Sequence, residues 1–218
     1  MSDRAAHWDG RYAEGAEGLS WFEPAPERSL ELLERAGLGP SMSVVDVGGG
    51  ASGLAAELVA RGHQDVTVVD VSAEALALAR LGMDEPEAVT WVRADVLAWE
   101  PDRTWDAWHD RAVFHFLVAP EQRAVYRSLL ARAVAPGGIV VVQTFAEDGP
   151  EACSGLPVQR WSPEALADEL AEVVEPLEVG RHVHATPWGA EQRFAWLVGC
   201  RSGRPTPDGR PERAPIRR

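Results

Sequence analysis

The chain has 218 residues, 45% of them hydrophobic and 25% charged, which suits one domain with a sizeable core and excludes wholesale disorder. Its 34 acidic and 21 basic residues give a net charge of -13, which argues against nucleic acid as a partner because the chain would repel a phosphate backbone. No apolar run approaches the roughly 20 residues of a membrane helix, and the polar N-terminus lacks the apolar stretch of a secretion signal. Two cysteines, Cys153 and Cys200, cannot form a disulfide framework, so we expect a cytoplasmic protein without membrane contacts.

The chain begins with a region that we expect to form an N-terminal helical lid, residues 1–40, with a helix over Glu27–Ala36. Residues 42–145 then alternate Val-rich runs with helix-like stretches. The predicted strands are Ser43–Val47, Val66–Asp70, Val89–Arg93, Ala107–His109 and Gly138–Phe145. The predicted helices between them are Gly53–Arg61, Ala73–Leu81 and Pro120–Val134. Apolar strands that alternate with helices indicate a doubly wound α/β fold around a parallel sheet.

The C-terminal third is less regular. Residues 146–161 contain several Gly and Pro residues and predict a long loop, either a lid or a linker. A helix is predicted from Pro163 to about Val174, followed by a hairpin of strands near Leu177–Val183 and Phe194–Cys200. We therefore place the core at residues 41–200. Residues 201–218 carry six Arg and several Pro and Gly residues, and we expect a disordered tail there.

A glycine-rich turn at residues 48–53 carries most of the functional information. It lies between a predicted strand and a predicted helix, and Gly48, Gly50 and Gly53 satisfy G-x-G-x-x-G. Such a turn lets a cofactor approach the backbone and the N–H groups of the helix amino end. Asp70 ends the next strand, where a carboxylate can accept hydrogen bonds from both ribose hydroxyls. A nicotinamide cofactor satisfies these features equally well.

Two further acidic residues and the position of the turn argue against a nicotinamide dinucleotide as the cofactor. Asp46 precedes the glycines as D-x-G-x-G, and an acid there would repel a pyrophosphate but suit a cationic or amino group. Asp95 closes the third strand, where it can accept from an adenine amino group. The turn also follows about 40 residues of chain, whereas a dinucleotide-binding fold often opens with it.

In order and spacing, these motifs resemble those of small bacterial class I S-adenosylmethionine-dependent methyltransferases over residues 7–200. Ser52 departs from the pattern, since glycine is common there. The matching segments are residues 46–50, Asp70, Asp95, residues 105–117, residues 135–138, and an N-terminal lid at residues 7–12 and 20–22. The resemblance implies a Rossmann-like seven-stranded sheet with an antiparallel C-terminal edge hairpin, and S-adenosyl-L-methionine as cofactor. The residues expected to bind it are Tyr12, Trp21, Asp46, Gly48, Gly49, Gly50, Asp70, Val71, Ala94, Asp95, Val96, Asp110 and Arg111.

The expected reaction is in-line transfer of a methyl group from a sulfonium, which depends mainly on positioning and the exclusion of water. The candidate catalytic residues follow the fourth strand and are His109, Asp110 and His115. His182 and His184 lie two apart on a predicted strand, so they should share a face. The candidate substrate-binding residues are Trp8, Cys153, His182 and His184. We expect no metal, because His182, His184 and Cys153 show no recognised ligand spacing.

A small molecule is the favoured acceptor, because 218 residues leave no room for a separate target-recognition domain. A protein side chain is the alternative acceptor. Two other classes stay open: a nicotinamide-dependent oxidoreductase, and an inactive cofactor-binding subunit of a larger complex. The acceptor atom and the oligomeric state do not follow from the sequence.

Overall fold

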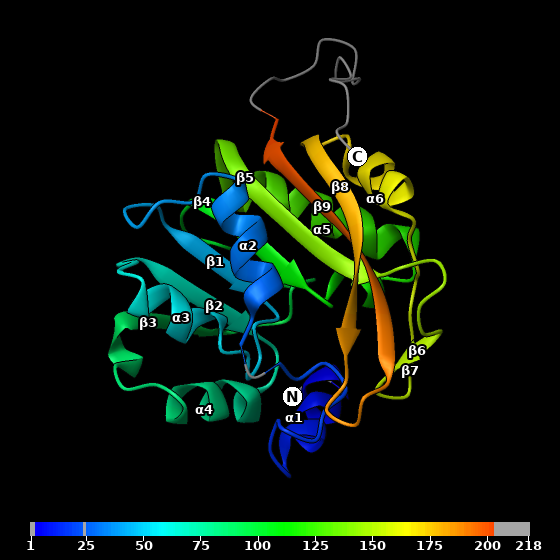
Figure 1. Ribbon diagram of the computed structural model, residues 1–218. Helices are drawn as coiled ribbons and strands as arrows, with labels where there is room; N and C mark the ends of the chain where they lie inside the picture. The colour runs from blue at the N-terminus through cyan, green and yellow to red at the C-terminus, as the bar shows by residue number, and fades with distance from the viewer. Residues whose placement is uncertain (1–2, 24, 203–218) are drawn as a thin grey trace.

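We describe a computed structural model of the chain, in which residues 3–23 and 25–202 are placed. A seven-stranded sheet in the order β3-β2-β1-β4-β5-β9-β8 forms its centre (Figure 1). Its first five strands run parallel, and β9 and β8 pair antiparallel at one edge. The strands are β1 (Val44–Val47), β2 (Val66–Asp70), β3 (Val89–Arg93), β4 (Trp105–Arg111), β5 (Val134–Phe145), β8 (Val174–Ala185) and β9 (Glu191–Arg201). This confirms the predicted fold class.

Helices cover both faces of the sheet because its central strands are apolar on both sides. Every residue of β1 and β2 is buried. One face packs against α5 (Pro120–Ala133) and α6 (Pro163–Leu170) through a cluster that includes Trp108, Tyr126 and Leu166. The opposite face packs against α2 (Glu27–Arg35), α3 (Leu54–Ala60) and α4 (Ala73–Leu81).

Several predicted boundaries change because tertiary pairing extends the strands. The fourth strand runs over Trp105–Arg111 rather than Ala107–His109, and the fifth begins at Val134, before the Pro-Gly-Gly turn expected to precede it. The sixth helix ends at Leu170, since the chain already enters β8 at Val174. Short 3-10 turns, η1 (Pro86–Ala88) and η2 (Phe114–Phe116), replace part of the expected loop and helix.

The two regions expected to cover the site contain regular structure. The N-terminal region forms α1 (Asp3–Tyr12), which packs against α4 below the sheet in Figure 1. The loop at residues 146–161 holds a small hairpin of β6 (Ala152–Cys153) and β7 (Leu156–Pro157). Residues 203–218 of the predicted tail lie outside the described residues. Among the helices of the described ranges, none has the length and apolar character needed to cross a membrane.

The start of α4 ties the N-terminal helix to the core. Ser72 caps α4, its hydroxyl oxygen accepting a hydrogen bond from the Ala75 N–H at 3.1 Å. The same hydroxyl donates to the Asp9 carboxylate of α1 at 2.7 Å. Ser162 caps α6 in the same way, but its hydroxyl makes only the contact with Ala165 among the side-chain hydrogen bonds of the described residues.

We expect Ser72→Ala to cost more free energy of unfolding than Ser162→Ala. Each variant loses a helix cap, at about 1 kcal/mol. The Ser72 variant also loses a hydrogen bond to a carboxylate, at about 1.5 kcal/mol more. Urea unfolding of both variants measures the difference. Equal losses would show that Ser72 does not hold α1 on the core.

Candidate active site

A cavity of about 520 Å³ opens at the carboxyl ends of the parallel strands. Its walls come from α1, the segment that follows it as far as Glu23, the ends of β1, β2, β3 and β4, and the β6–β7 hairpin. Ligands of doubly wound sheets bind at this edge, where the connections diverge. No group of three or more His, Cys, Asp or Glu side chains that could hold a metal ion occurs in the described part of the chain.

The glycine turn forms the floor of the cavity, and three of its positions have no room for a side chain. Gly48 and Gly50 have φ angles of +64° and +52°, which favour glycine. A Cβ atom on Gly48 would overlap the Val113 side chain. On Gly49 it would lie 2.5 Å from Asp46 Oδ2, and on Gly50 2.6 Å from the Tyr12 hydroxyl oxygen. The turn therefore keeps its backbone bare on the cavity side.

Asp70, at the end of β2, presents a buried carboxylate to the cavity. It is 8% exposed, and its Oδ1 accepts from the Ser72 N–H at 2.8 Å. Burial raises the pKa of Asp70 to about 6, against the lowering effect of backbone N–H groups that include that of Gly50. The carboxylate can therefore accept further hydrogen bonds from a ligand, which would compensate for the hydration that burial removes.

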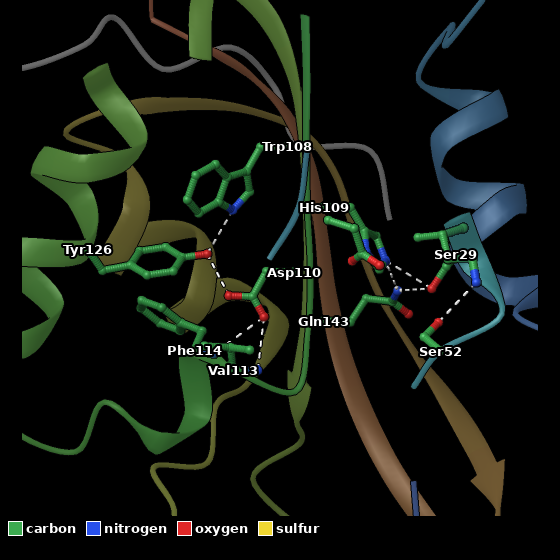
Figure 2. Close-up of polar contacts among 11 residues, drawn as sticks. Ser29, Ser52, Trp108, His109, Asp110, Val113, Phe114, Tyr126 and Gln143 are labelled. Carbon is green, nitrogen blue, oxygen red and sulfur yellow. Dashed lines mark hydrogen bonds and ion pairs between the residues drawn. The ribbon is translucent and has the colours of Figure 1, made fainter. Parts of the chain in front are cut away.

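Asp46 and His109 form a buried pair on the neighbouring strands β1 and β4. His109 Nδ1 lies 2.7 Å from Asp46 Oδ1, and its Nε2 lies 2.9 Å from the Ser29 hydroxyl and 3.2 Å from Gln143 Nε2 (Figure 2). The Gln143 amide nitrogen can only donate, and it also bonds Ser29 at 2.9 Å. His109 Nε2 is thus an acceptor, so a neutral ring carries its proton on Nδ1 and donates it to Asp46.

Asp110, the next residue of β4, points to the opposite face of the sheet (Figure 2). It is fully buried and accepts from the Tyr126 hydroxyl at 2.7 Å and from the Val113 N–H at 3.0 Å. Tyr126 in turn accepts from Trp108 Nε1 at 3.0 Å. Burial raises the pKa of Asp110 to about 6. This carboxylate holds the turn after β4, which brings Val113 against Gly48.

An ionic cluster lies at the other end of the cavity, beside the β8–β9 hairpin. Arg111 donates to the Glu23 carboxylate at 2.8 Å and to the Trp21 carbonyl at 3.0 Å. His184 Nδ1 lies 3.1 Å from Glu23 Oε1, and its Nε2 donates to the Ser20 carbonyl at 2.8 Å. Arg111 and His184 together hold the pKa of Glu23 below its ordinary value. The cluster fixes the segment after α1 over the cavity.

Comparison with known proteins identifies the fold and the domain. Residues 44–138 match the family model of a methyltransferase domain. The trans-aconitate 2-methyltransferase of Azoarcus sp. strain BH72 is 37% identical over 126 residues, which are 57% of this chain and 47% of that protein. Nodulation protein S of Rhizobium tropici is 31% identical over 120 residues, 55% of this chain and 50% of that protein. The chain spans about half the length of these curated relatives.

Residues 44–138 therefore have the sequence pattern of a methyltransferase domain. The fold of the chain is that of the N-methyltransferase NodS from Bradyrhizobium japonicum WM9 in complex with S-adenosyl-L-homocysteine, with a TM-score of 0.70. That likeness has 18% sequence identity and covers 91% of this chain and 99% of the other.

Most of the residues expected at the site lie on the cavity wall of this domain. These are Trp8, Tyr12, Trp21, Asp46, Gly48, Gly49, Asp70, Val71, Ala94, Asp95, Val96, His109, Arg111 and Cys153. Gly50 lies just behind them, against Tyr12 and Asp70. Four expected residues lie off the wall: Asp110, His115, His182 and His184.

The position of these four residues corrects the roles expected from the sequence. Asp110 faces the α5 side of the sheet, since alternate residues of a strand point in opposite directions. His115 is fully buried, and desolvation lowers its pKa to about 3, so it does not suit a base. His182 stacks on Phe194 and has a pKa lowered by burial to about 4. His184 does share the inner face of β8 with His182, but it contacts Glu23 behind the wall.

Polar residues of α1 and of the following segment also line the cavity, and these were not predicted from the sequence. Arg4 forms an ion pair with Asp95 at 2.7 Å, and His7 and Glu23 also line the wall. Arg4, His7 and Trp8 are spaced three and four residues apart, so they lie on one face of a helix. This spacing could have predicted that one face of α1 lines the site. The roles of Glu23 and Ser29 could not be predicted from neighbouring residues, because their hydrogen-bond partners lie far away in the sequence.

We expect Tyr126→Phe to lower the free energy of unfolding by about 3 kcal/mol while leaving cofactor affinity within about twofold. The change leaves the Trp108 N–H and the Asp110 carboxylate buried without their partner. Tyr12→Phe is the matched control, because it removes a cavity-facing hydroxyl bonded to Trp21. Urea unfolding and calorimetry with S-adenosylhomocysteine give the two values. A large loss of affinity in Tyr126→Phe would show that Asp110 acts on the cofactor.

Proposed function

We propose that the protein is an enzyme that transfers the methyl group of S-adenosylmethionine to a small-molecule acceptor. The observation that carries this proposal is one cavity with two chemically different ends. One end combines glycine backbone with the buried carboxylate of Asp70 and the partly exposed carboxylate of Asp95. The other is lined by aromatic and aliphatic side chains such as Trp8, Phe116 and Leu156.

The polar end fits the cofactor. Asp70 would accept hydrogen bonds from the ribose hydroxyls, and Asp95 with its neighbours Ala94 and Val96 would contact the adenine. The glycine turn lets the cofactor approach the backbone closely on the cavity side. Val71 also lines this end.

Asp46 and the rings of Tyr12 and Trp21 would hold the cationic part of the cofactor. Asp46 Oδ1 is taken by His109, which leaves Oδ2 as the acceptor for a cationic group. Tyr12 and Trp21 meet edge to face at 6.2 Å, and aromatic faces stabilise a sulfonium. His109 is thereby a positioning residue: it orients Asp46 and is not itself placed to take a proton.

The cofactor supplies an already activated methyl group. The chain therefore contributes by positioning the two reactants and by excluding water from the site. Residues 1–40 would act as the lid, because α1 and the segment to Glu23 wall the cavity. A cavity of about 520 Å³ suits a small acceptor better than a protein side chain that enters from a partner surface. The name of the relative trans-aconitate 2-methyltransferase agrees with a small acceptor.

We expect Asp70→Ala to weaken binding of S-adenosylhomocysteine by about 1.5–3 kcal/mol in calorimetry, the scale of hydrogen bonds to a charged group. The wild-type affinity should also rise with pH through about 6 and level off above it, since the ribose requires the ionised carboxylate. Asp70→Asn, which does not titrate, should lose this pH dependence. An Asp70→Ala affinity equal to that of the wild type would contradict the ribose assignment.

Methyl transfer from labelled S-adenosylmethionine to a pool of small metabolites tests the proposed function itself. Transfer of label to a small molecule supports it. Tight cofactor binding with no labelled product from any pool would contradict it and favour a cofactor-binding subunit without activity.

A further inference from the structure

Arg111 places a guanidinium with unused donors in the wall of the apolar end of the cavity. It follows Asp110 at the end of β4, and its side chain is 13% exposed. Of its five N–H groups, one bonds Glu23 and one bonds Trp21, while Nε is buried without a partner in the described part of the chain. Its plane lies over the Phe194 ring at 5.2 Å. A buried guanidinium with free donors suits an anionic or carbonyl oxygen.

Glu23 leaves most of the Arg111 donors free. Its Oε1 contacts both Arg111 and His184 Nδ1. The His184 Nε2 donates to the Ser20 carbonyl, which can only accept. One carboxylate oxygen of Glu23 thus serves both the guanidinium and the imidazole, and Asp46 is a second acid whose charge acts on Arg111. The nearby His182 adds no charge, since burial holds its pKa at about 4.

Few side chains in the wall of the cavity are suited to act as a base. Burial raises the pKa of the Cys153 thiol to about 11 and that of the Tyr12 hydroxyl above its ordinary value. Both ring nitrogens of His109 are already bonded. His7 has a buried Nε2 without a partner among the described residues. It lies one turn along α1 from Arg4, which pairs with Asp95, so we place it toward the polar end of the cavity and away from the acceptor. An acceptor held by Arg111 therefore has to bind with its nucleophilic atom already deprotonated.

Resting on the function proposed above, we propose that the acceptor is a small carboxylic acid with an apolar body, whose carboxylate is held by Arg111. A carboxylate is ionised near neutral pH and needs no base. One of its oxygens forms the new C–O bond while the C–S bond of the methyl donor breaks. The electron pair stays on sulfur, no proton moves, and the product is a methyl ester. The apolar body would lie against Trp8, Phe116 and Leu156.

An amine held by the Glu23 carboxylate is the rival acceptor, and a base treatment separates the two products. Methyl esters are hydrolysed by alkali and release volatile methanol, whereas N-methyl groups are stable. The probes are phenylacetate, trans-cinnamate and trans-aconitate, with phenethylamine as the matched amine. Each is incubated with the full-length protein and S-adenosylmethionine labelled in its methyl group. The same acids are then titrated onto the complex with S-adenosylhomocysteine in calorimetry, a measurement independent of turnover.

We expect base-labile label from at least one acid and calorimetric binding of that acid. Arg111→Gln should raise the KM and the Kd of the acid by about 10- to 100-fold, the scale of a hydrogen bond to a charged group, with a smaller change in kcat. Arg111→Lys should show a partial loss. Arg127→Gln is the matched control, because Arg127 is 20% exposed, pairs with Glu169 and Glu172, and lies off the cavity. Glu23→Gln should leave acid binding intact or tighter, since it frees the guanidinium.

Each of the following results would overturn the inference. Base-stable label alone, from phenethylamine or from a metabolite pool, contradicts the carboxylate acceptor and leaves the methyltransferase function standing. Loss of activity in Glu23→Gln but not in Arg111→Gln favours the amine. Abolition of acid methylation in His7→Gln, with acid binding unchanged, shows a required base. The melting temperature of each variant shows that it is folded. A loss of cofactor affinity in folded Arg111→Gln would assign Arg111 to the carboxylate of the cofactor and would contradict its role toward the acceptor. No transfer to any probe or pool contradicts the proposed function as well.

Discussion

The architecture of the site depends on three carboxylates buried at the carboxyl ends of adjacent strands, Asp46, Asp70 and Asp110. A carboxylate removed from water is costly unless hydrogen bonds replace its hydration. Each is compensated differently: Asp46 by the His109 ring, Asp70 by backbone N–H groups, and Asp110 by the Tyr126 hydroxyl and the turn after β4. These bonds fix the loops that carry the glycines and Val113, and so they fix the shape of the cavity.

The fold and the polar end of the cavity were predictable because their signals are local. The Val-rich run Val66–Asp70 and the Ser72 cap predict the bounds of β2 and α4 to the residue. The glycines of residues 48–50 are needed because Val113, Asp46 and Tyr12 leave no space for a Cβ atom. Strand alternation also explains why Asp110 was misplaced: two consecutive residues of β4 cannot both face the cavity, and His109 occupies that side.

The acceptor end was not predictable in the same way, because long-range contacts build it. Glu23 meets Arg111 across 88 residues, and His184 meets Ser20 across 164. His184 was expected to touch substrate, yet it contacts Glu23 in the segment after α1. The net charge of -13 likewise does not reveal that a largely buried guanidinium, that of Arg111, lies in the wall of the cavity. The local charge at a site depends on the few ionisable groups that the fold brings together there. The net charge of the whole chain does not predict it.

A crystal structure of the protein with S-adenosylhomocysteine tests the central claim most directly, namely that one cavity holds the cofactor at its polar end and the acceptor at its apolar end. The account predicts the ribose hydroxyls within hydrogen-bonding distance of Asp70, and the sulfur open to the space beside Arg111 and Trp8. A ligand whose adenine fills the aromatic end, or whose sulfur faces away from Arg111, would contradict it.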